Sequence, residues 1–391
     1  MVPKLRFTSF KDTWSSAYLS KLIVSLDAGV SVNSIDELPD DNEHSILKTS
    51  CVSFGYFDNT ERKKVVKDEI PRLKEMLVSN SILISRMNTP ALVGANAYIK
   101  DAPENTFVPD RLWQVKVNDN ICNIKWLANF LSSDKGRSLL KEQASGTSNS
   151  MKNITKKDVF QIMLDFPSKE EQTKIADFLS SADEKITLMN KQYDLLCRYK
   201  KGMMQKIFSQ EVRFKDEYGE DFPVWHHKSL GDICRIRTGK LDANAMVVGG
   251  KYRFYTCARE FYQIDEYAFD TEALLISGNG ANVGYIHYYS GKFNAYQRTY
   301  VLDGFNHNIA YVKYFLDMYL NERIYGEKKE GNTPYIVMGT LADMQIKLPI
   351  IKEQTKIANF LSSLDDKITT KKAELDKLKT WKQGLLQQMF V

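Results

Sequence analysis

The sequence has little cysteine and no long apolar run. Its five cysteines are scattered, and no two of them form a C-x-x-C pair. This spacing argues against a zinc module and a disulfide framework, and it fits a reducing compartment. No stretch contains 18 consecutive apolar residues, and the first residues lack the apolar run of a signal peptide. We therefore expect a soluble, cytoplasmic protein.

Catalytic motifs are also missing. The five histidines show no metal-ligand spacing, and no G-x-S-x-G elbow occurs. Residues 278–284 (GNGANVG) carry the third glycine one residue too late for a dinucleotide or S-adenosylmethionine loop, so a hairpin turn is the better interpretation. Residues 332–335 (NTPY) lack the second proline of the amino-methyltransferase motif, and residues 238–240 (TGK) lack the neighbours of a P-loop. The sequence therefore predicts a chain without catalytic residues or a metal site.

The bulk composition indicates a globular protein of more than one module. A chain of 391 residues is too long for one ordinary core, and its 43% hydrophobic and 26% charged residues are typical of folded proteins. The net charge of +5 permits nucleic-acid binding without requiring it. The 12% of aromatic residues fit strand-rich modules with large contact surfaces, and they fit ordinary β cores equally well.

The chain is an internal duplication. Residues 171–187 read EQTKIADFLSSADEKIT and residues 353–369 read EQTKIANFLSSLDDKIT, so 14 of 17 positions are identical at an offset of 182. Weaker matches continue outward in the same order, including a tryptophan early in each half, Trp14 and Trp225. Each half therefore consists of a divergent front domain (1–167 and 211–349) and a near-constant tail (168–210 and 350–391).

The tails predict long helices with a heptad seam. Apolar residues recur four and three residues apart through almost all of each tail, which is typical of a coiled coil. A helix of about 40 residues is roughly 60 Å long. We expect the two tail helices to pair antiparallel around a pseudo-twofold axis. Seam and partner-binding positions are Ile175, Phe178, Leu179, Ile186, Tyr193, Leu196, Ile357, Phe360, Leu361, Ile368, Leu375 and Leu378.

Three lysines, Lys200, Lys371 and Lys382, interrupt the seam. They mark either the helix register, a partner surface or simply a solvated face, and the sequence leaves these alternatives open.

The front domains predict an α+β fold with a twisted, mostly antiparallel sheet. In the second front domain, residues 254–257, 273–276, 285–289 and 300–302 read as strands, and a helix follows at 309–321. The first front domain repeats this order and predicts a helix at 124–141.

These motifs resemble the specificity subunits of type I restriction-modification systems. The similarity is carried by a proline followed by E-Q-x-K-I-A-x-F-L-S-x-x-D-x-K-I, which occurs twice at the start of long helices. The early tryptophans and the stretch LLISGNGANVG resemble target recognition domains. The similarity is strong in the tails and weak in the fronts.

The resemblance implies a non-catalytic subunit of bacterial or archaeal phage defence. Each target recognition domain would read one half of an asymmetric, bipartite double-stranded DNA site, and the helices would fix the gap. Two methyltransferase subunits would dock on the helices and methylate adenine, and ATP-dependent restriction/translocase subunits would join them. S-adenosylmethionine, ATP and Mg are expected on those partners, with no cofactor in this chain.

Polar and basic residues in or beside the front-domain loops are candidates for DNA contact. Arginine and asparagine can read base edges through paired hydrogen bonds, whereas lysine mostly meets phosphate. The candidates are Arg86, Asn88, Arg111, Ser148, Asn149, Lys240, Arg253, Arg259, Asn279, Asn282, Arg298, Lys328, Lys329 and Asn332. Arg111 and Arg298 fall at matching places in the two fronts, which favours a shared backbone contact or a fold role over base reading.

Two other functions compete with DNA recognition. A coiled-coil scaffold would bind proteins through its front domains and would have no affinity for duplex DNA. A stand-alone DNA enzyme with a degenerate active site would methylate or cleave DNA by itself. The duplicated helix motif argues against both.

Overall fold

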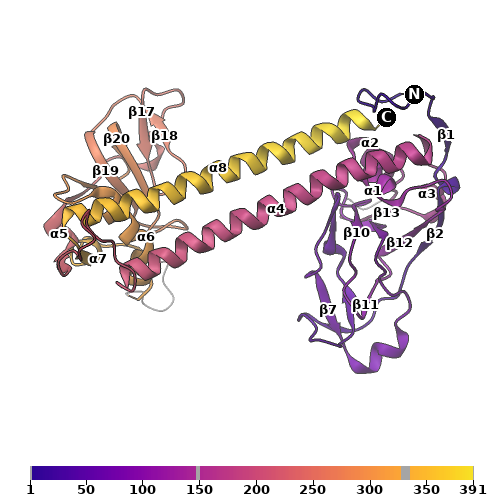
Figure 1. Cartoon of the computed structure of the whole chain (residues 1–391), viewed down its shortest axis with the longest axis horizontal. Helices are drawn as coiled ribbons and strands as arrows, with labels where there is room; N and C mark the ends of the chain where they lie inside the picture. The colour runs from indigo at the N-terminus through magenta and orange to yellow at the C-terminus, as the bar shows by residue number, and fades with distance from the viewer. Residues whose placement is uncertain (1, 147–149, 327–334, 391) are drawn as a thin grey trace. The chain divides into compact units, whose positions relative to one another are not determined.

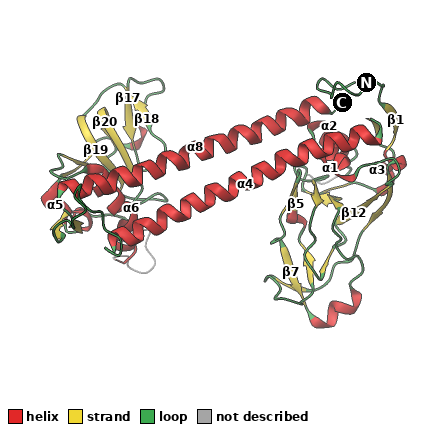
Figure 2. Ribbon diagram, in the orientation of Figure 1, coloured by secondary structure: helices red, strands yellow, loops and turns green. Residues whose placement is uncertain are grey.

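The computed structural model describes residues 2–146, 150–326 and 335–390 of the chain (Figures 1 and 2). The chain folds into two compact units. Unit 1 comprises Met1–Asn190 and Glu374–Val391, and unit 2 comprises Lys191–Ala373. Each unit therefore contains one front domain together with parts of both tail helices.

The two tails form long continuous helices. Helix α4 runs over Lys169–Phe208 with 40 residues, and α8 runs over Ile351–Met389 with 39 residues. The α4 helix begins just after Ser168, whose Oγ accepts a hydrogen bond from the Glu171 amide at 3.4 Å. In unit 1 the last part of α8 packs with the first part of α4, and in unit 2 the first part of α8 packs with the last part of α4 (Figure 1).

The described part of unit 1 contains two four-stranded sheets. The first has the strand order β10 (Asn96–Ile99), β8 (Ser81–Ser85), β12 (Leu112–Val117), β2 (Ile23–Asp27), and all of its pairs are antiparallel. The second has the order β11 (Thr106–Phe107), β4 (Ser45–Leu47), β7 (Arg62–Val65), β3 (Ser34–Ile35). The sequence predicted one sheet here, and this was wrong because residues 34–65 supply three strands of a second sheet.

Short strand pairs and short helices surround these sheets. The pairs are β1 (Ser15–Tyr18) with β14 (Met163–Phe166), β5 (Val52–Ser53) with β6 (Tyr56–Phe57), and β9 (Met87–Asn88) with β13 (Lys152–Asn153). The α-helices are α1 (Ile124–Ser132), α2 (Asp134–Glu142) and α3 (Lys156–Phe160).

The helix predicted over 124–141 is divided at Ser133. Its backbone is extended, with φ −66° and ψ 163°, and its Oγ accepts from the Gly136 amide as the N-cap of α2. A Cβ atom at Gly136 would lie 2.1 Å from the Phe130 carbonyl oxygen, so only glycine fits against the end of α1. One continuous helix was therefore a wrong prediction.

Unit 2 is built on one six-stranded sheet. Its order is β16 (Arg235–Thr238), β21 (Thr299–Asp303), β19 (Phe269–Ser277), β20 (Ile286–Ala295), β17 (Tyr252–Tyr255), β18 (Tyr262–Ile264). All neighbours are antiparallel except β17 and β20. The four predicted strands and the mostly antiparallel sheet are thus confirmed, and residues 278–285 form the turn of the β19–β20 hairpin as expected.

Further elements of unit 2 repeat the surroundings of the unit 1 sheet. Strand β15 (His226–Ser229) pairs with β22 (Gln345–Leu348), as β1 pairs with β14. The helices are α5 (Leu230–Ile233), α6 (Ile309–Gly326) and α7 (Met338–Ala342). The helix predicted over 309–321 is therefore confirmed and continues for another turn.

Both units use the same buried ion pair at the start of the tail helix. Arg6 donates from Nε and Nη2 to the carboxylate of Glu171 at 2.7 and 2.8 Å. Arg213 contacts Glu353 in the same way, at 3.2 and 2.8 Å. The two glutamates are almost completely buried, at 1% and 0% exposed. The glutamate shared by both copies of the repeat thus anchors the segment that enters each front domain.

The glutamine after that glutamate ties the helix to the domain. Gln172 Oε1 accepts from the Asn123 amide at 2.8 Å, and its Nε2 donates to the carbonyl of the proline before the helix at 3.0 Å. Gln354 makes the same two contacts, with the Asn308 amide at 2.9 Å and with its own preceding proline at 2.7 Å. A buried amide group satisfied on both sides fixes the helix start in each unit.

Each core is completed by the end of a helix from the other half of the sequence. Phe390 packs against Trp126 and Phe130 in unit 1, with ring centroids 6.0 Å apart in both cases. Phe208 packs against Tyr311 and Phe315 in unit 2, at 5.7 and 5.4 Å. These phenylalanines are related by the offset of 182.

Within the described ranges, no helix is long and apolar enough to cross a membrane. The same ranges contain no group of three or more His, Cys, Asp or Glu side chains arranged to hold a metal ion.

Candidate nucleic-acid interface

Four loops of unit 2 bring candidate residues together. Arg259, after β17, donates from Nε to the Asn282 Oδ1 in the β19–β20 turn at 3.3 Å. Asn282 Nδ2 donates to the carbonyl of Cys257 at 3.1 Å. Within the described chain no hydrogen bond or ion pair is found for the two terminal nitrogens of Arg259, so they remain available for a ligand. An arginine in this state can donate twice to a guanine edge.

Arg298 joins the same group through its backbone. Its carbonyl accepts from the Gly278 amide at 2.9 Å and lies 3.5 Å from the Cys257 Sγ, while its side chain is exposed. Arg111 has the matching place in unit 1, because its carbonyl accepts from the Arg86 amide at 3.1 Å and its side chain is exposed. Both arginines thus lie just before β12 or β21 and share one backbone role.

Lys240 and Asn279 flank the same loops. Lys240 is exposed and is followed by Leu241, which bridges Tyr296 in the β20–β21 turn. Asn279 is half-buried in the β19–β20 turn and bridges Tyr335. The structure therefore gathers five candidates from four separate loops into one group, which we call the loop cluster: Lys240, Arg259, Asn279, Asn282 and Arg298.

Arg253 lies apart from this group, on strand β17. Its guanidinium stacks between the rings of Phe261 and Tyr289, at 4.3 and 4.5 Å from their centroids, and Nη1 donates to the Tyr255 hydroxyl at 3.3 Å. It lines an open cavity of about 410 Å³ together with Lys292. Stacking holds the planar cation in one orientation while leaving it charged.

His287 belongs to the loop cluster but was not among the sequence candidates. Its Nε2 lies 3.0 Å from the Ala258 carbonyl oxygen, and its ring contacts Tyr255 and Tyr285 at 5.0 and 4.8 Å. Burial lowers the pKa of His287, which favours the neutral ring. The alternation Tyr285, His287, Tyr289 on one face of a strand was the signal that could have identified it.

In unit 1 the remaining candidates are tied to the fold. The Arg86 guanidinium lies 5.7 Å from the Trp113 ring centroid, and its Nε is buried. Asn88 donates to the Ser85 Oγ at 3.1 Å and accepts from the Thr89 amide at 2.8 Å, so both ends of its side chain are engaged. The other sequence candidates, Ser148, Asn149, Lys328, Lys329 and Asn332, lie outside the described residues.

The predicted seam residues of the tail helices are all buried or half-buried. Five of the twelve are buried: Ile175, Leu179, Ile357, Leu361 and Leu375. The other seven are half-buried: Phe178, Ile186, Tyr193, Leu196, Phe360, Ile368 and Leu378. The ring of Phe178 stacks edge-on to Trp381 at 5.9 Å.

Two of the lysines that interrupt the seam form matching ion pairs. Lys382 contacts Asp183 in unit 1, and Lys200 contacts Asp365 in unit 2, each at 2.5 Å. Both pairs join one helix to the other, and they are exchanged by the offset of 182. Of the alternatives that the sequence left open for these two lysines, the ion pairs favour a role in helix register.

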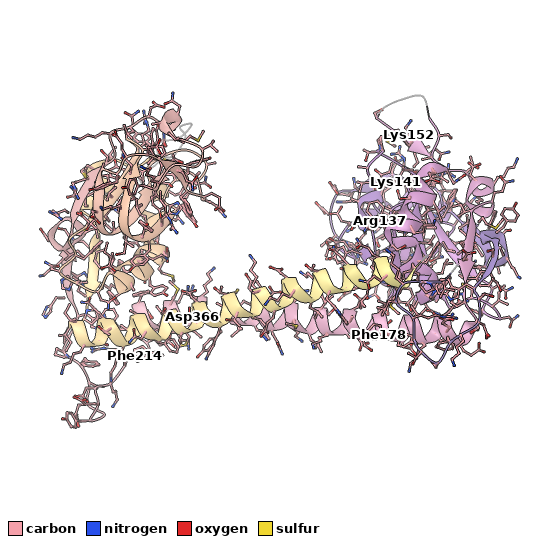
Figure 3. The ribbon with its side chains drawn as sticks, turned by 90° about the horizontal axis from the view of Figure 1, so that it is seen from above. Arg137, Lys141, Lys152, Phe178, Phe214 and Asp366 are labelled. Carbon is pink, nitrogen blue, oxygen red and sulfur yellow. The ribbon has the colours of Figure 1, made fainter. Side chains whose placement is uncertain are left out.

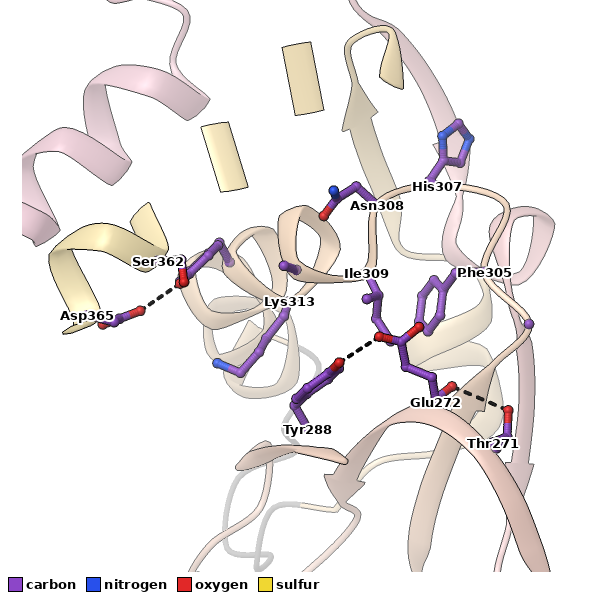
Figure 4. Close-up of a pocket in the computed structure, with 13 residues that line it drawn as sticks. Thr271, Glu272, Tyr288, Phe305, His307, Asn308, Ile309, Lys313, Ser362 and Asp365 are labelled. Carbon is purple, nitrogen blue, oxygen red and sulfur yellow. Dashed lines mark hydrogen bonds between the residues drawn. The ribbon is translucent and has the colours of Figure 1, made fainter. Parts of the chain in front are cut away.

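A groove lies at corresponding places in the two units, beside α1, α4 and α8 in unit 1 and beside α6 and α8 in unit 2. Groove 1, in unit 1, has a volume of about 460 Å³ and includes Ser180 and Asp183. Groove 2, in unit 2, has a volume of about 800 Å³ and includes Ser362 and Asp365, the repeat counterparts of those residues. Figure 4 shows the side chains that line groove 2, with Lys313 and Tyr288 between Asp365 at the left and Glu272 at the right.

The chain thus contains two related domains, and each is followed by a helix of about 40 residues. This arrangement defines a class of internally duplicated, two-domain proteins. The model of the type I restriction modification DNA specificity domain matches residues 40–197 and 224–380. The chain belongs to this family.

Relatives agree with this assignment. The type I restriction enzyme EcoDI specificity subunit of Escherichia coli is 40% identical over 167 residues, which cover 41% of this chain and 37% of that protein. The chain thus spans little more than a third of EcoDI. The type I restriction enzyme MjaVIII specificity subunit of Methanocaldococcus jannaschii is 27% identical over 288 residues, covering 66% of this chain and 67% of that protein.

Solved structures share the fold. The S subunit of a type I restriction-modification system from M. genitalium aligns with a TM-score of 0.64 at 19% identity, covering 100% of this chain and 99% of that one. A chain from a study of complex assembly and conformational transition of the type I R-M system aligns with a TM-score of 0.54 at 15% identity, covering 97% and 98%.

Proposed function

We propose that this chain reads an asymmetric, bipartite DNA site for a type I restriction-modification complex. The observation that carries this proposal is that one chain presents two domains on one repeated frame while their loops differ. The frame is the pair of glutamate–arginine contacts at Glu171 and Glu353. Repeated anchors with different loops suit two reading heads that recognise different half-sites.

The reading residues are proposed to lie on the gathered loops of unit 2 and on β17. Arg259 keeps its terminal nitrogens free and is oriented by Asn282, which suits paired donation to guanine. Arg253, held between two aromatic rings, is a second reader. Lys240 and Arg298 are exposed and would meet phosphates, whereas Arg86 and Asn88 would support the fold of unit 1.

The tail helices are proposed to form an antiparallel coiled coil that sets the gap between half-sites and docks two methyltransferase subunits. The reciprocal Lys200–Asp365 and Lys382–Asp183 contacts support this pairing, because the earlier position on α4 contacts the later position on α8 and the later contacts the earlier. Heads related by a twofold prefer one face of the duplex, with half-site centres about one helical turn apart.

Catalysis is proposed to reside in the partners. Methyltransferase subunits would carry S-adenosylmethionine, and ATP-dependent restriction/translocase subunits would use ATP and Mg. This chain would supply only the recognition of the DNA sequence.

A base-resolution map of adenine methylation tests the proposal. The source cell is compared with and without this gene, in conditions in which the chain and its methyltransferase are expressed. Loss of one asymmetric, gapped motif on deletion is expected, and it would reveal both half-sites. An unchanged methylome would contradict the proposal and favour a protein-binding coiled-coil scaffold.

A further inference from the structure

The two equivalent grooves differ in charge. Groove 1 is lined by Lys125, Arg137 and Lys379, in addition to the Lys382–Asp183 pair. Asp183 is the one carboxylate among the described residues that line it. Because that carboxylate already contacts Lys382, three cations are left without a neutralising partner in the lining.

The chemistry of groove 2 is reversed. Its described lining contains Glu272 as well as Asp365, and one lysine, Lys313. Lys313 already contacts Asp317 at 2.7 Å, and Asp365 contacts Lys200. The charge left unpaired in the described lining is therefore the carboxylate of Glu272, which accepts a hydrogen bond from the Tyr288 hydroxyl at 2.6 Å. A groove at the same place in the repeat therefore repels an anion in unit 2 and attracts one in unit 1.

An aromatic ring organises the cations of unit 1. The Arg137 guanidinium and the Lys141 ammonium lie 4.2 and 5.4 Å from the ring centroid of Phe54. Arg137 also donates from Nε to the Ser132 carbonyl at 2.9 Å, and its nearest carboxylate is the exposed Asp134 at 3.9 Å. The short contacts of the guanidinium are thus with neutral groups, and its contact with the exposed Asp134 carboxylate is long, so little of its charge is neutralised.

The cations continue beyond groove 1. Figure 3 shows Arg137, Lys141 and then Lys152 following one another along one side of unit 1. Lys152 donates to the Gly146 carbonyl at 2.6 Å, and its strand pairs with Asn88. A row of cations of this kind matches the repeated charges of a nucleic-acid backbone better than a single anion.

We propose that groove 1 and this row bind backbone phosphates of the DNA duplex, and that groove 2 has no such role. The inference rests on the proposed DNA-reading function and deepens it. Unit 1 would supply backbone affinity that does not depend on DNA sequence, and the residues that supply it are not among the candidates for base reading. The electrostatic contribution to binding is then unequal between the two halves.

Salt-dependent binding of the full-length chain to duplex DNA, alone and in complex with its methyltransferase, tests this. The duplex carries the motif found by methylation mapping, and a second duplex has a scrambled motif. The variant combines Lys125→Gln, Arg137→Gln and Lys379→Gln. The slope of log K against log salt should become shallower by roughly 0.9 for each phosphate that is no longer neutralised. Both duplexes should lose affinity alike, and the methylated motif should stay the same.

Two matched controls accompany the variant. Lys11→Gln, Lys67→Gln and Lys157→Gln together remove equal charge from exposed positions outside groove 1, and Lys313→Gln alters groove 2. Neither should change the slope by as much as the groove 1 variant. Circular dichroism melting verifies that each variant is folded.

Three results would overturn the inference. An unchanged salt slope in the groove 1 variant would show that these side chains do not contact phosphates. An equal loss in the matched lysine control shows a general effect of net charge. Loss of methyltransferase association with the slope of the free chain unchanged assigns the groove to a protein partner. By contrast, a wild-type complex without duplex affinity would refute the proposed function itself.

Discussion

Glu353 accepts three hydrogen bonds in the core of unit 2, two from Arg213 and one from the Trp225 Nε1 at 3.1 Å. Its counterpart Glu171 accepts two from Arg6. Trp14, the counterpart of Trp225 in unit 1, packs against Trp126 instead, with ring centroids 6.3 Å apart. Its Nε1 makes no hydrogen bond to any described residue. The buried glutamate therefore accepts one more hydrogen bond in unit 2 than in unit 1.

Glu353→Gln should destabilise unit 2 by on the order of 3 kcal/mol, because it removes the buried counter-charge of the half-buried Arg213 guanidinium. Glu171→Gln should cost less in unit 1, where the carboxylate accepts one hydrogen bond fewer. Hydrogen exchange followed by mass spectrometry resolves the two units and gives the opening free energy of each. Equal costs in the two units would show that the Trp225 contact adds nothing.

The helix-to-helix ion pairs predict a charge-swap result. Lys200→Asp and Asp365→Lys should each weaken the packing of unit 2, and the double variant should recover most of the loss. Because Asp365 is 41% exposed, the coupling energy should be no more than about 1 kcal/mol. A double-mutant cycle in urea measures it. A coupling of zero would mean that the two charges contribute nothing to register.

The phenylalanines at the helix ends predict a crossed pattern of destabilisation. Phe390→Ala should open unit 1 by about 3–5 kcal/mol, and Phe208→Ala should do the same to unit 2, because each leaves a cavity among aromatic rings. Tyr199→Ala, at a side chain that is 52% exposed, is the control and should change little. Exchange rates in α1 and α6 report the two units separately. A Phe390 variant that loosened α6 instead of α1 would contradict the packing.

Acid should weaken unit 2 through two histidines. Burial lowers the pKa of His287 and His307 below the usual value of 6.5, so the folded state binds protons less readily than the unfolded chain. At pH values above 6.5 both histidines are neutral in the folded and the unfolded chain, so they do not make the free energy of unfolding depend on pH. The free energy of unfolding of unit 2 falls as the pH drops below 6.5, and the loss is complete below the folded pKa. His287→Gln should flatten this dependence in urea titrations from pH 7.5 to 5, and an unaltered curve would exclude His287 as its source.

Base reading by the loop cluster predicts a defect confined to one half-site. Arg259→Ala should cost about 1–3 kcal/mol on the cognate duplex and relax one position of the half-site read by unit 2. Asn282→Ala should give a similar but smaller change, because Asn282 orients Arg259. Methylation mapping of cells carrying each variant shows the motif directly. Equal weakening on all sequences would instead identify Arg259 as a phosphate contact.

The tail helices, and four strands and the main helix of the second front domain, could be predicted from sequence because the evidence is local. A heptad pattern and a repeat at one offset need no knowledge of distant residues. The positions of Lys200 and Lys382 could not be explained from sequence, because both interrupt the apolar pattern. Their contacts with the carboxylates of Asp365 and Asp183 on the opposite helix explain these positions. A charge within a seam cannot be interpreted until its partner is known.

The site was predicted less completely, for physical reasons that particular residues illustrate. Arg259 and Asn282 were found as polar loop residues, but their contact joins loops 23 residues apart. Arg137 and Lys141 were missed because helical cations usually belong to a solvated face, and their stacking on Phe54 depends on a tertiary contact. The second sheet of unit 1 was missed because its strands contain only two to four residues.

The division of the chain between its units has a consequence for synthesis on the ribosome. Unit 2 is one continuous segment, whereas unit 1 needs a second segment that begins at Glu374 and is made after all of unit 2. Until Leu385, Met389 and Phe390 emerge, the apolar core around Trp126 lacks part of its cover. Domains usually complete in the order in which they are translated. Here unit 2 can fold first, and the nascent first front domain presents an open hydrophobic face until unit 2 has been made.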